Sequence, residues 1–473
     1  MPTIAEEIAA LTGAVTDLSD GVEAVRSQAQ AWAESATAPG AAGTKSSKSW
    51  AGEAAASATA AGAAGAAAGA SAAALLYRAL PAAQRNLIDC YFPSLVTDFV
   101  REQVIRNGAA VGATDILSFS SGSKWVVGAN GNYAKAAANG PAFDYSTGRK
   151  GLLIEAAAAT NLLKYSHDYA QGLWSKSGGG TGSAPVVTPN YGVAPDGTTT
   201  ATRVQFDAGA GASDSDWSIL SQTVAGLISG NPYTGSLFVK GVAGTTLVFR
   251  HAGGGAYQIV ALTGAWQRIA KTEIAAETSG SFDVGLRGTY SSGTTADVQV
   301  WHGQLEAGSF ATSPIPTGAS GIVRIADDVR LMPAALSLLQ APVSTIVLRG
   351  QALSAVSYYT IFGTNAGGVN LSAAGADWRL WSTDSHELVV TPPAPSLSFG
   401  LALASSASGG RAASMNSGPV AADAFAHYTG MTAMRLGAMV DGSYASSILI
   451  DEIAIAPIYA LNASLQAAAR AWQ

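Results

Sequence analysis

The stretch from Ala296 to Thr317, which reads ADVQVWHGQLEAGSFATSPIPT, constrains the fold of this chain most strongly. Val298 and Val300 alternate with polar or aromatic neighbours, and this period of two is typical of a β-strand with both faces occupied. Pro314 and Pro316 follow, and proline ends a strand ladder because it lacks the N–H donor and has a fixed φ. We therefore expect the closing strand of a β-sandwich here, with a domain end directly after it.

Three upstream features accompany this closing strand. Residues 151–166 read GLLIEAAAATNLLKYS, Trp174 follows, and residues 194–198 read APDGT. Together with WHGQLEAG and TSPIPT, and in this order, these motifs resemble a module of phage tail-fibre and head-fibre proteins that spans residues 110–330. The resemblance implies a β-jelly-roll similar to carbohydrate-binding modules, carried on a virion appendage.

Other strand patterns flank and follow these motifs. Residues 237–240, 247–250 and 282–284 alternate as strands do, and Asn130-Gly131 between two short runs predicts a type I′ hairpin. From Val329 onward a second set of strands is expected at 345–349, 358–363, 377–381, 387–391, 397–403, 434–439 and 449–456. MRLGAMVDG and ILIDEIAIAP resemble the last strands of laminin-G or concanavalin-like sandwiches, in which a helix, here residues 462–472, closes the edge.

The N-terminus has a heptad pattern. Apolar residues spaced alternately by four and three form a seam that ends at Trp32, and such a seam predicts self-association through Ile4, Ile8, Leu11, Val15, Leu18, Val22, Val25, Ala29 and Trp32. The β-branched and leucine placement alone favours a dimer, whereas the resemblance to fibre proteins implies a homotrimer.

Between this seam and the β region, the sequence predicts more helix. No charge occurs between Glu53 and Arg78, but Ala, Gly, Ser and Thr carry too little apolar area for a membrane span, so a packed helical stalk is expected. Residues 81–109 regain apolar bulk, with Leu95, Val96 and Phe99 placed on an interrupted helix that would form a collar.

Charge and cysteine content restrict the function classes. Charged residues make up 12% of the chain and the net charge is −6, with no basic stripe, which argues against nucleic-acid binding. Cys90 is the sole cysteine, so no disulfide can form within a chain. The first residues lack the basic start of a secretory signal, and assembly in the host cytoplasm is expected.

No catalytic or metal-binding pattern emerges. The five histidines are widely separated, and carboxylates such as Asp214, Asp216, Glu306, Asp451 and Glu452 cannot be paired across a cleft from sequence. Asp207, Asp214 and Asp216 could hold a structural calcium ion, although a solvated turn is the simpler interpretation. Because Glu155 and Glu306 belong to the fibre motifs, we assign them to strand ends and subunit contacts. No residue is nominated as catalytic and no cofactor is expected.

Sugar recognition requires aromatic faces for the apolar side of a pyranose, with polar groups beside them. Trp174, Trp266 and Trp301 lie within the fibre motifs and are assigned to the core. The aromatic residues outside these motifs are the glycan-binding candidates, namely Trp217, Tyr257, Tyr290, Trp378, Trp381 and Tyr444.

The sequence thus predicts α+β structure in separate regions. An N-terminal coiled-coil stalk that attaches to the virion (1–80) and a helical collar (81–109) precede two antiparallel β-sandwiches, a jelly-roll (110–320) and a laminin-G-like domain (321–473). The expected function is attachment to host surface polysaccharide by a homotrimeric virion fibre that contacts other virion proteins through its N-terminal region. An architectural head-fibre or tail decoration protein is the first alternative, and a glycan depolymerase is the second.

Overall fold

The computed structural model describes residues 95–469, apart from residues 100–102, 107–108, 252–254, 354–357, 366, 373–376, 383–385, 395 and 426–430. The heptad seam, the alanine-rich segment and the collar up to residue 94 lie outside the described residues. The described part is mostly β-structure and contains two short α-helices, α4 (Pro333–Leu339) and α5 (Asn462–Ala468). In these ranges no helix is long and apolar enough to cross a bilayer.

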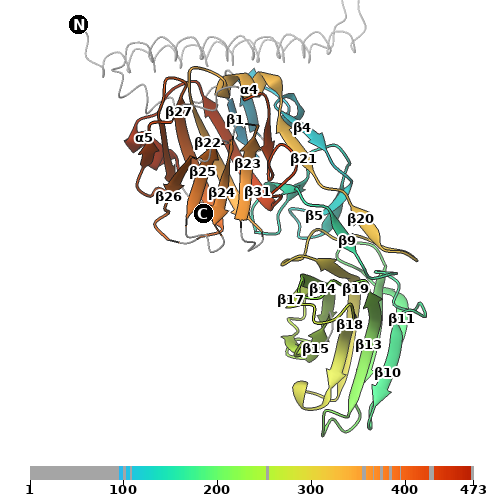
Figure 1. The fold of residues 1–473 in the computed structure, drawn as a ribbon. Helices are drawn as coiled ribbons and strands as arrows, with labels where there is room; N and C mark the ends of the chain where they lie inside the picture. Colours follow the sequence, from blue (N-terminus) through green and yellow to red (C-terminus); the bar gives the residue numbers. More distant parts are fainter. Residues whose placement is uncertain are drawn as a thin grey trace, which may run out of the picture. The chain divides into compact units, whose positions relative to one another are not determined.

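Residues 175–307 form two five-stranded antiparallel sheets, called the jelly-roll sandwich below (Figure 1). The first sheet has the strand order β10 (Ser175–Gly179), β13 (Trp217–Ala225), β18 (Ser279–Arg287), β15 (Thr246–Arg250) and β16 (Gln258–Ala261). The second sheet has the order β11 (Ser183–Gly192), β12 (Ala201–Asp207), β19 (Thr295–Ala307), β14 (Pro232–Gly241) and β17 (Gln267–Ile274). The strands expected at 237–240, 247–250 and 282–284 are therefore confirmed.

The expected closing strand is β19, and it lies between β12 and β14. Val298 and Val300 point into the core, as their alternation predicted. The register then shifts, because Ser236 pairs with Gln304 but Phe238 pairs with Trp301, and His302 has a φ of 49°. This β-bulge leaves Trp301 on the outer face of the sheet and returns Leu305 to the core.

A second sandwich is built from both ends of the described chain and is called the discontinuous sandwich below. Its larger sheet includes β28 (Arg411–Met415), β27 (Ser398–Ser406), β22 (Val343–Ala352), β31 (Ser447–Ala456), β1 (Leu95–Asp98) and β2 (Gln103–Arg106), with β8 (Gly151–Glu155) also paired to β31. Its other sheet has the order β26 (Glu387–Val390), β25 (Trp378–Ser382), β24 (Gly367–Ser372), β23 (Tyr358–Thr364), β30 (Met434–Leu436), β21 (Asp328–Leu331) and β4 (Leu117–Ser120).

The domain boundary differs from the one expected at residue 320. Phe119 pairs with Val329, and Leu153 pairs with Leu449, so strands β4 and β8 belong to the sandwich that also contains the C-terminal strands. In Figure 1 the blue strand β1 lies among orange and red strands of late sequence. The jelly-roll sandwich is thus an insertion within the discontinuous sandwich. Assigning consecutive strands to one domain, as the sequence patterns suggested, cannot detect such an insertion.

The collar expected at 81–109 is wrong for its described part, which contains strands β1 and β2. Leu95, Thr97 and Phe99 are buried on one face, and the Thr97 hydroxyl accepts a hydrogen bond from the Ile453 backbone N–H at 3.0 Å. This period of two was hidden by the apolar Val96 between them. The C-terminal helix is present but ends at Ala468.

The expected hairpin consists of β5 (Lys124–Val127) and β6 (Tyr133–Ala136). Its loop has five residues, 128–132, rather than the two of a type I′ turn. The Gly128 N–H donates to the Asn132 carbonyl at 2.8 Å, and Gly131 has a φ of 78°. Gly131 therefore supplies the positive φ that the sequence predicted at this position, but in a loop that is longer than expected.

Candidate aromatic binding face

One face of the sheet β10-β13-β18-β15-β16 carries the candidate site. Phe282, Val284 and Leu286 of β18 point into the core, so the alternate residues Asp283, Gly285 and Arg287 lie on the outer face. Residues directly opposite in an antiparallel ladder share a face. Trp217 lies opposite Arg287, and Arg250 lies opposite Asp283, so both join this outer face.

Tyr257 is the centre of this group. Its ring has the Arg250 guanidinium at 4.4 Å and the Arg287 guanidinium at 5.4 Å from its centroid, and Arg287 donates a 3.3 Å hydrogen bond to its hydroxyl. The Tyr290 ring lies 5.7 Å away, tilted by 53°. We call Arg250, Tyr257, Arg287 and Tyr290 the aromatic–arginine platform.

The two arginines of the platform differ in their charge partners. Arg250 donates to Asp283 at 2.6 Å, and Ser281 donates to the same carboxylate oxygen at 2.9 Å. Among the described residues Arg287 has no carboxylate partner within ion-pair distance, and its side chain bonds to Tyr257. Arg250 is therefore a fixed support under Tyr257, whereas Arg287 retains donors for a ligand.

Trp217 extends the same face towards β10. Its ring lies over Gly179, where an added Cβ would come within 2.0 Å of the indole Nε1. Glycine at this position lets the indole lie against the sheet, as Gly179 pairs directly with Trp217. Trp217, Tyr257 and Tyr290 are thus three sequence candidates that the fold places on one side of one sheet, with Tyr290 38% exposed.

The other three candidates lie in the discontinuous sandwich. Trp378 is fully buried and packs edge-on against Phe399, so it has no face for a sugar and is removed from the candidate set. Trp381 is half-buried on β25, and Tyr444 is exposed in a loop with a φ of 51°. Neither lies in the sheet that carries the platform.

The three tryptophans assigned to the core have three different environments. Trp174 is buried beside Phe282, inside the sandwich. Trp301 is buried outside it, because the β5–β6 hairpin covers it with Trp125 and Tyr133. Trp266 is half-buried and donates from its indole Nε1 to the Val193 carbonyl at 3.1 Å.

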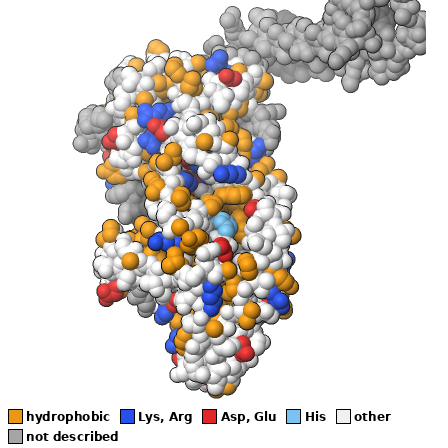
Figure 2. Space-filling view, turned by 90° about the vertical axis from the view of Figure 1, so that its right-hand side faces the viewer, with side chains coloured by type: hydrophobic (Ala, Val, Ile, Leu, Met, Phe, Trp, Pro, Cys, Tyr) orange, Lys and Arg blue, Asp and Glu red, His pale blue; other side chains and the backbone are white. Residues whose placement is uncertain are grey.

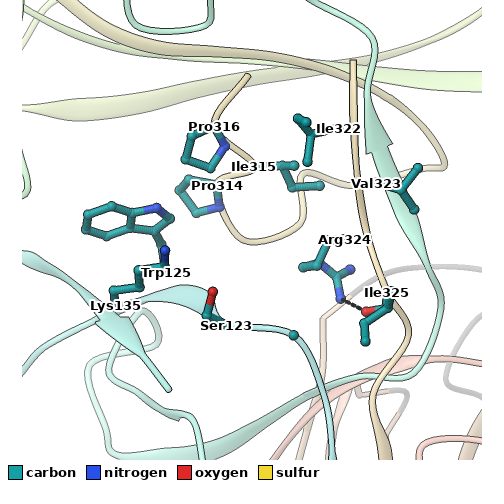
Figure 3. A pocket seen from close by; sticks show the side chains of 11 residues that line it. Ser123, Trp125, Lys135, Pro314, Ile315, Pro316, Ile322, Val323, Arg324 and Ile325 are labelled. Carbon is teal, nitrogen blue, oxygen red and sulfur yellow. Dashed lines mark hydrogen bonds between the residues drawn. The ribbon is translucent and has the colours of Figure 1, made fainter. Parts of the chain in front are cut away.

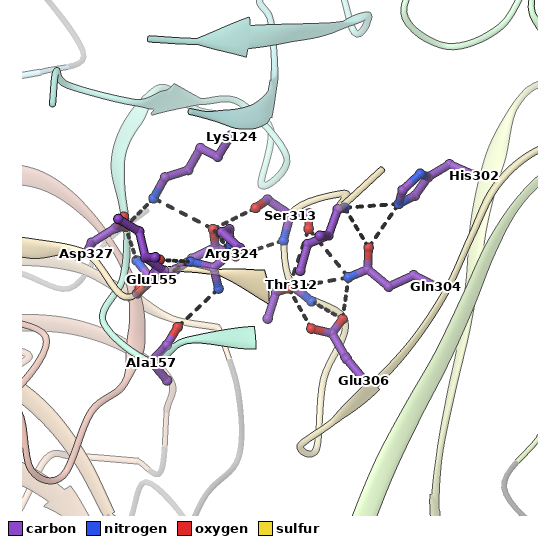
Figure 4. A network of polar contacts seen from close by, with 12 residues as sticks. Lys124, Glu155, Ala157, His302, Gln304, Glu306, Thr312, Ser313, Arg324 and Asp327 are labelled. Carbon is purple, nitrogen blue, oxygen red and sulfur yellow. Dashed lines mark hydrogen bonds and ion pairs between the residues drawn. The ribbon is translucent and has the colours of Figure 1, made fainter. Parts of the chain in front are cut away.

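The two glutamates of the fibre motifs lie in a buried polar network (Figure 4). Glu155 accepts hydrogen bonds from the Ser313 N–H and hydroxyl, both at 2.7 Å. Lys124 bonds the Asp327 carboxylate, which also accepts from the Glu155 N–H at 2.7 Å. Burial alone would raise the pKa of Glu155, but Arg324, Lys124 and the Ser313 bonds together lower it. The opening and closing motifs are therefore in direct contact. Glu155 and Glu306 lie at the ends of β8 and β19, as expected, but both are buried within the chain and bond to its own residues instead of forming the expected subunit contacts.

Glu306 has a different environment. Its carboxylate accepts from the Thr312 N–H at 2.9 Å, the Thr312 hydroxyl at 2.6 Å and the Gln304 amide at 2.6 Å. Burial raises the pKa of Glu306, and this outweighs the hydrogen bonds from Thr312 and Gln304 and the charge of Arg268, which act to lower it. Next to Gln304 lies the buried His302, whose ring nitrogen is 3.3 Å from that of His167.

Asp216 is one of the residues considered for a structural calcium ion. The Asp216 carboxylate accepts from Thr181 through both its N–H and hydroxyl at 2.8 Å and from the Ala212 N–H at 3.0 Å, so it joins the turn between β10 and β11 to its own loop. Within the described ranges, no group of three or more His, Cys, Asp or Glu residues is arranged to hold a metal ion.

Comparisons with known proteins give no family. No family model matches the sequence, and no curated protein matches it. Among solved structures, the CBM40 module of the Ruminococcus gnavus IT-sialidase bound to α2,3-sialyllactose is 18% identical with a TM-score of 0.25, covering 28% of this chain and 86% of the module. The botulinum neurotoxin serotype C1 binding domain is 9% identical with a TM-score of 0.25, covering 30% of this chain and 40% of that domain. A CBM4 structure is 16% identical with a TM-score of 0.20, covering 26% of this chain and 87% of that structure. At these values the likenesses identify no ligand of this chain.

Proposed function

We propose that this chain is a phage fibre protein whose jelly-roll sandwich binds a glycan of the host surface. The observation that carries the binding role is the aromatic–arginine platform, in which Tyr257 and Tyr290 lie beside Arg287 on an outer sheet face. An aromatic face can stack on the apolar side of a pyranose, and guanidinium donors can bond its hydroxyls. The virion role rests on the ordered motifs from GLLIE to TSPIPT.

Several such sites would act together. One aromatic stack contributes about 1 kcal/mol beyond the area that it buries, so a single site binds weakly. The heptad seam of residues 1–32 would join copies of the chain, as a trimer in a fibre, and linked sites gain avidity because the second contact forms at high effective concentration. The proposed role is attachment without turnover.

A glycan array probed with the full chain tests the proposal. We expect selective binding to some glycans, and Tyr257→Ala and Tyr290→Ala should each weaken binding to them about fivefold, the equivalent of ~1 kcal/mol. The matched control is Tyr191→Ala, because Tyr191 is also exposed and lies under an arginine, Arg203, at 4.9 Å, but on the other sheet. Thermal melts of each variant check folding.

Three outcomes would contradict the proposal. Binding to no glycan on the array would favour the architectural alternative. Equal binding by wild type and both platform variants, with all variants folded, would remove the platform as the site. The attachment role also predicts that bound polysaccharide is not shortened, and a rise in reducing ends during incubation would favour the depolymerase alternative.

A further inference from the structure

A pocket of about 390 Å³ lies away from the platform, between the β5–β6 hairpin, the loop at 314–316 and strand β20 (Ile322–Arg324) (Figure 3). Strand β20 pairs with β9 (Ala159–Asn161) in a two-stranded sheet, and no strand among the described residues pairs with its other edge. On the face of the molecule drawn in Figure 2, hydrophobic side chains lie at the surface near the middle. Pockets of this size suit small ligands.

The walls of the pocket are apolar. Trp125, Pro314 and Pro316 lie close together on one side in Figure 3, and the Trp125 ring is held edge-on against the buried Trp301 at 6.2 Å. Ile322 and Val323 line it from β20 and are 43% and 58% exposed. A rigid indole beside two proline rings is a flat wall, which suits a ring rather than a flexible chain.

The charges of the pocket all have one sign. Its lining includes Lys135 and Arg324 and no carboxylate. Arg324 is buried and already engaged, with an ion pair to Glu155 at 3.5 Å and hydrogen bonds to the carbonyls of Ala157 and Ile325. Lys135 is exposed and has no ion-pair partner among the described residues. Its ammonium can therefore pair with a ligand acid at the rim.

The geometry points to a binding site for a small organic acid with an apolar ring, the ring lying against Trp125 and the prolines and the acidic group at Lys135. A sugar does not fit this chemistry. Ser123 provides the only side-chain hydroxyl in the lining, and each sugar hydroxyl buried without a partner would cost binding energy. This site is therefore distinct from the platform and takes a different class of ligand.

The test uses two fluorescent probes on the purified full chain. 8-Anilinonaphthalene-1-sulfonate is a ring-bearing anion, and N-phenyl-1-naphthylamine is its uncharged counterpart. We expect saturable binding of the anion at one site per chain, at least fivefold tighter than the neutral probe. Lys135→Met should weaken the anion about fivefold and leave the neutral probe unchanged, while Lys164→Met, an exposed lysine outside the lining, should change neither.

A second variant shows whether the probe occupies this pocket. Ile322→Glu places a carboxylate in the wall and should weaken the anion at least tenfold, with the thermal melt unchanged because Ile322 is already half-exposed. Glucuronate should not displace the anion. The proposal is overturned if Ile322→Glu leaves the affinity for the anion unchanged, if Lys135→Met weakens both probes equally, or if glucuronate competes.

Discussion

Lys124 and Lys135 lie on paired strands of one hairpin but have opposite environments. Lys124 is buried and pairs with Asp327 and, at 3.7 Å, with Glu155, whereas Lys135 is exposed at the rim of the pocket. A buried ion pair adds little net stability when complete, but removal of one partner leaves an uncompensated buried charge. The two lysines therefore offer a matched comparison of a structural and a surface cation.

We predict that Lys124→Met lowers the free energy of unfolding by about 3–5 kcal/mol, because Asp327 loses its cationic partner. Lys135→Met should change this free energy by less than about 0.5 kcal/mol, as for other surface substitutions. Urea unfolding of both variants measures the difference. Equal stability of the two variants would contradict the ion-pair network as drawn in Figure 4.

The His167 and His302 pair predicts a dependence of stability on pH. Burial lowers the pKa of His167 to about 4, and burial together with the nearby His167 lowers the pKa of His302 well below its usual value. Between about pH 6.5 and pH 4 the unfolded chain binds protons that the folded chain does not, so stability falls as the pH falls through this range.

His167→Gln should remove part of this loss, on the order of 3 kcal/mol at pH 4 relative to pH 8. Calorimetric melts of wild type and variant across this range give the comparison. The raised pKa of Glu306 acts in the opposite direction, since its protonated form is favoured by burial, and it is present in both proteins. Parallel pH profiles for the two proteins would contradict the assignment to His167.

At the scale of elements, the sequence patterns identified strands well and their partners poorly. Alternation located β14, β15, β18 and β19, because each has one face on a core. The same rule missed β1, because Val96 packs against a second apolar cluster on the opposite face, so the run is apolar on both faces and looks helical. No local pattern could show that β8 pairs with β31 almost 300 residues later, since strand pairing depends on which edges meet.

The candidate site was likewise recoverable only in part. Trp217, Tyr257 and Tyr290 could be named as aromatics outside the motifs, but Arg250 and Arg287 could not, because their approach to Tyr257 depends on the register of three strands. The alternation of Arg250 and Arg287 with buried core residues was the available signal. The sequence could not exclude Trp378 from the glycan-binding candidates, because only the folded sandwich shows that the face of its strand that carries it is buried.

Strand β19 gives the prediction at this scale. Truncation at Gly293 removes β19, the strand that joins β12 to β14, and thereby opens two edges in the middle of one sheet. It also removes every later strand, so β1, β4 and β8 lose their partners in the discontinuous sandwich. Unpaired edges template aggregation, so the truncated chain should be insoluble or should lose its cooperative melt. A soluble truncation with a wild-type melting profile would contradict the central position of β19.

At the scale of the whole molecule, the proposal combines a self-associating N-terminus with a weak binding face. Residues 1–32 lie outside the described residues, so the homotrimer and the virion attachment remain predictions from the heptad pattern and the fibre motifs. The insertion of the jelly-roll sandwich between strands β8 and β21 means that both of its ends connect to the discontinuous sandwich. A two-point connection holds a binding domain more firmly than a single linker does.

The seam itself can be tested in the full chain. Leu11→Asp and Leu18→Asp would each place an unpaired carboxylate in every copy of a buried seam, at a cost of several kcal/mol, and should dissociate the oligomer. Light scattering gives the mass directly, and circular dichroism of the β region checks that the rest stays folded. An unchanged mass in both variants would mean that residues 1–32 do not hold the copies together.

The central claim is that Tyr257 and Tyr290 mediate attachment to a host glycan, and adsorption tests it most directly. Purified full-length wild type, the double variant Tyr257→Ala/Tyr290→Ala and the control Tyr191→Ala are incubated with host cells, and the bound fraction is measured after thermal melts confirm folding. The account predicts that the double variant loses at least tenfold in adsorption, because avidity amplifies the loss at each linked site, while the control adsorbs as wild type does. Undiminished adsorption by the folded double variant would contradict the account.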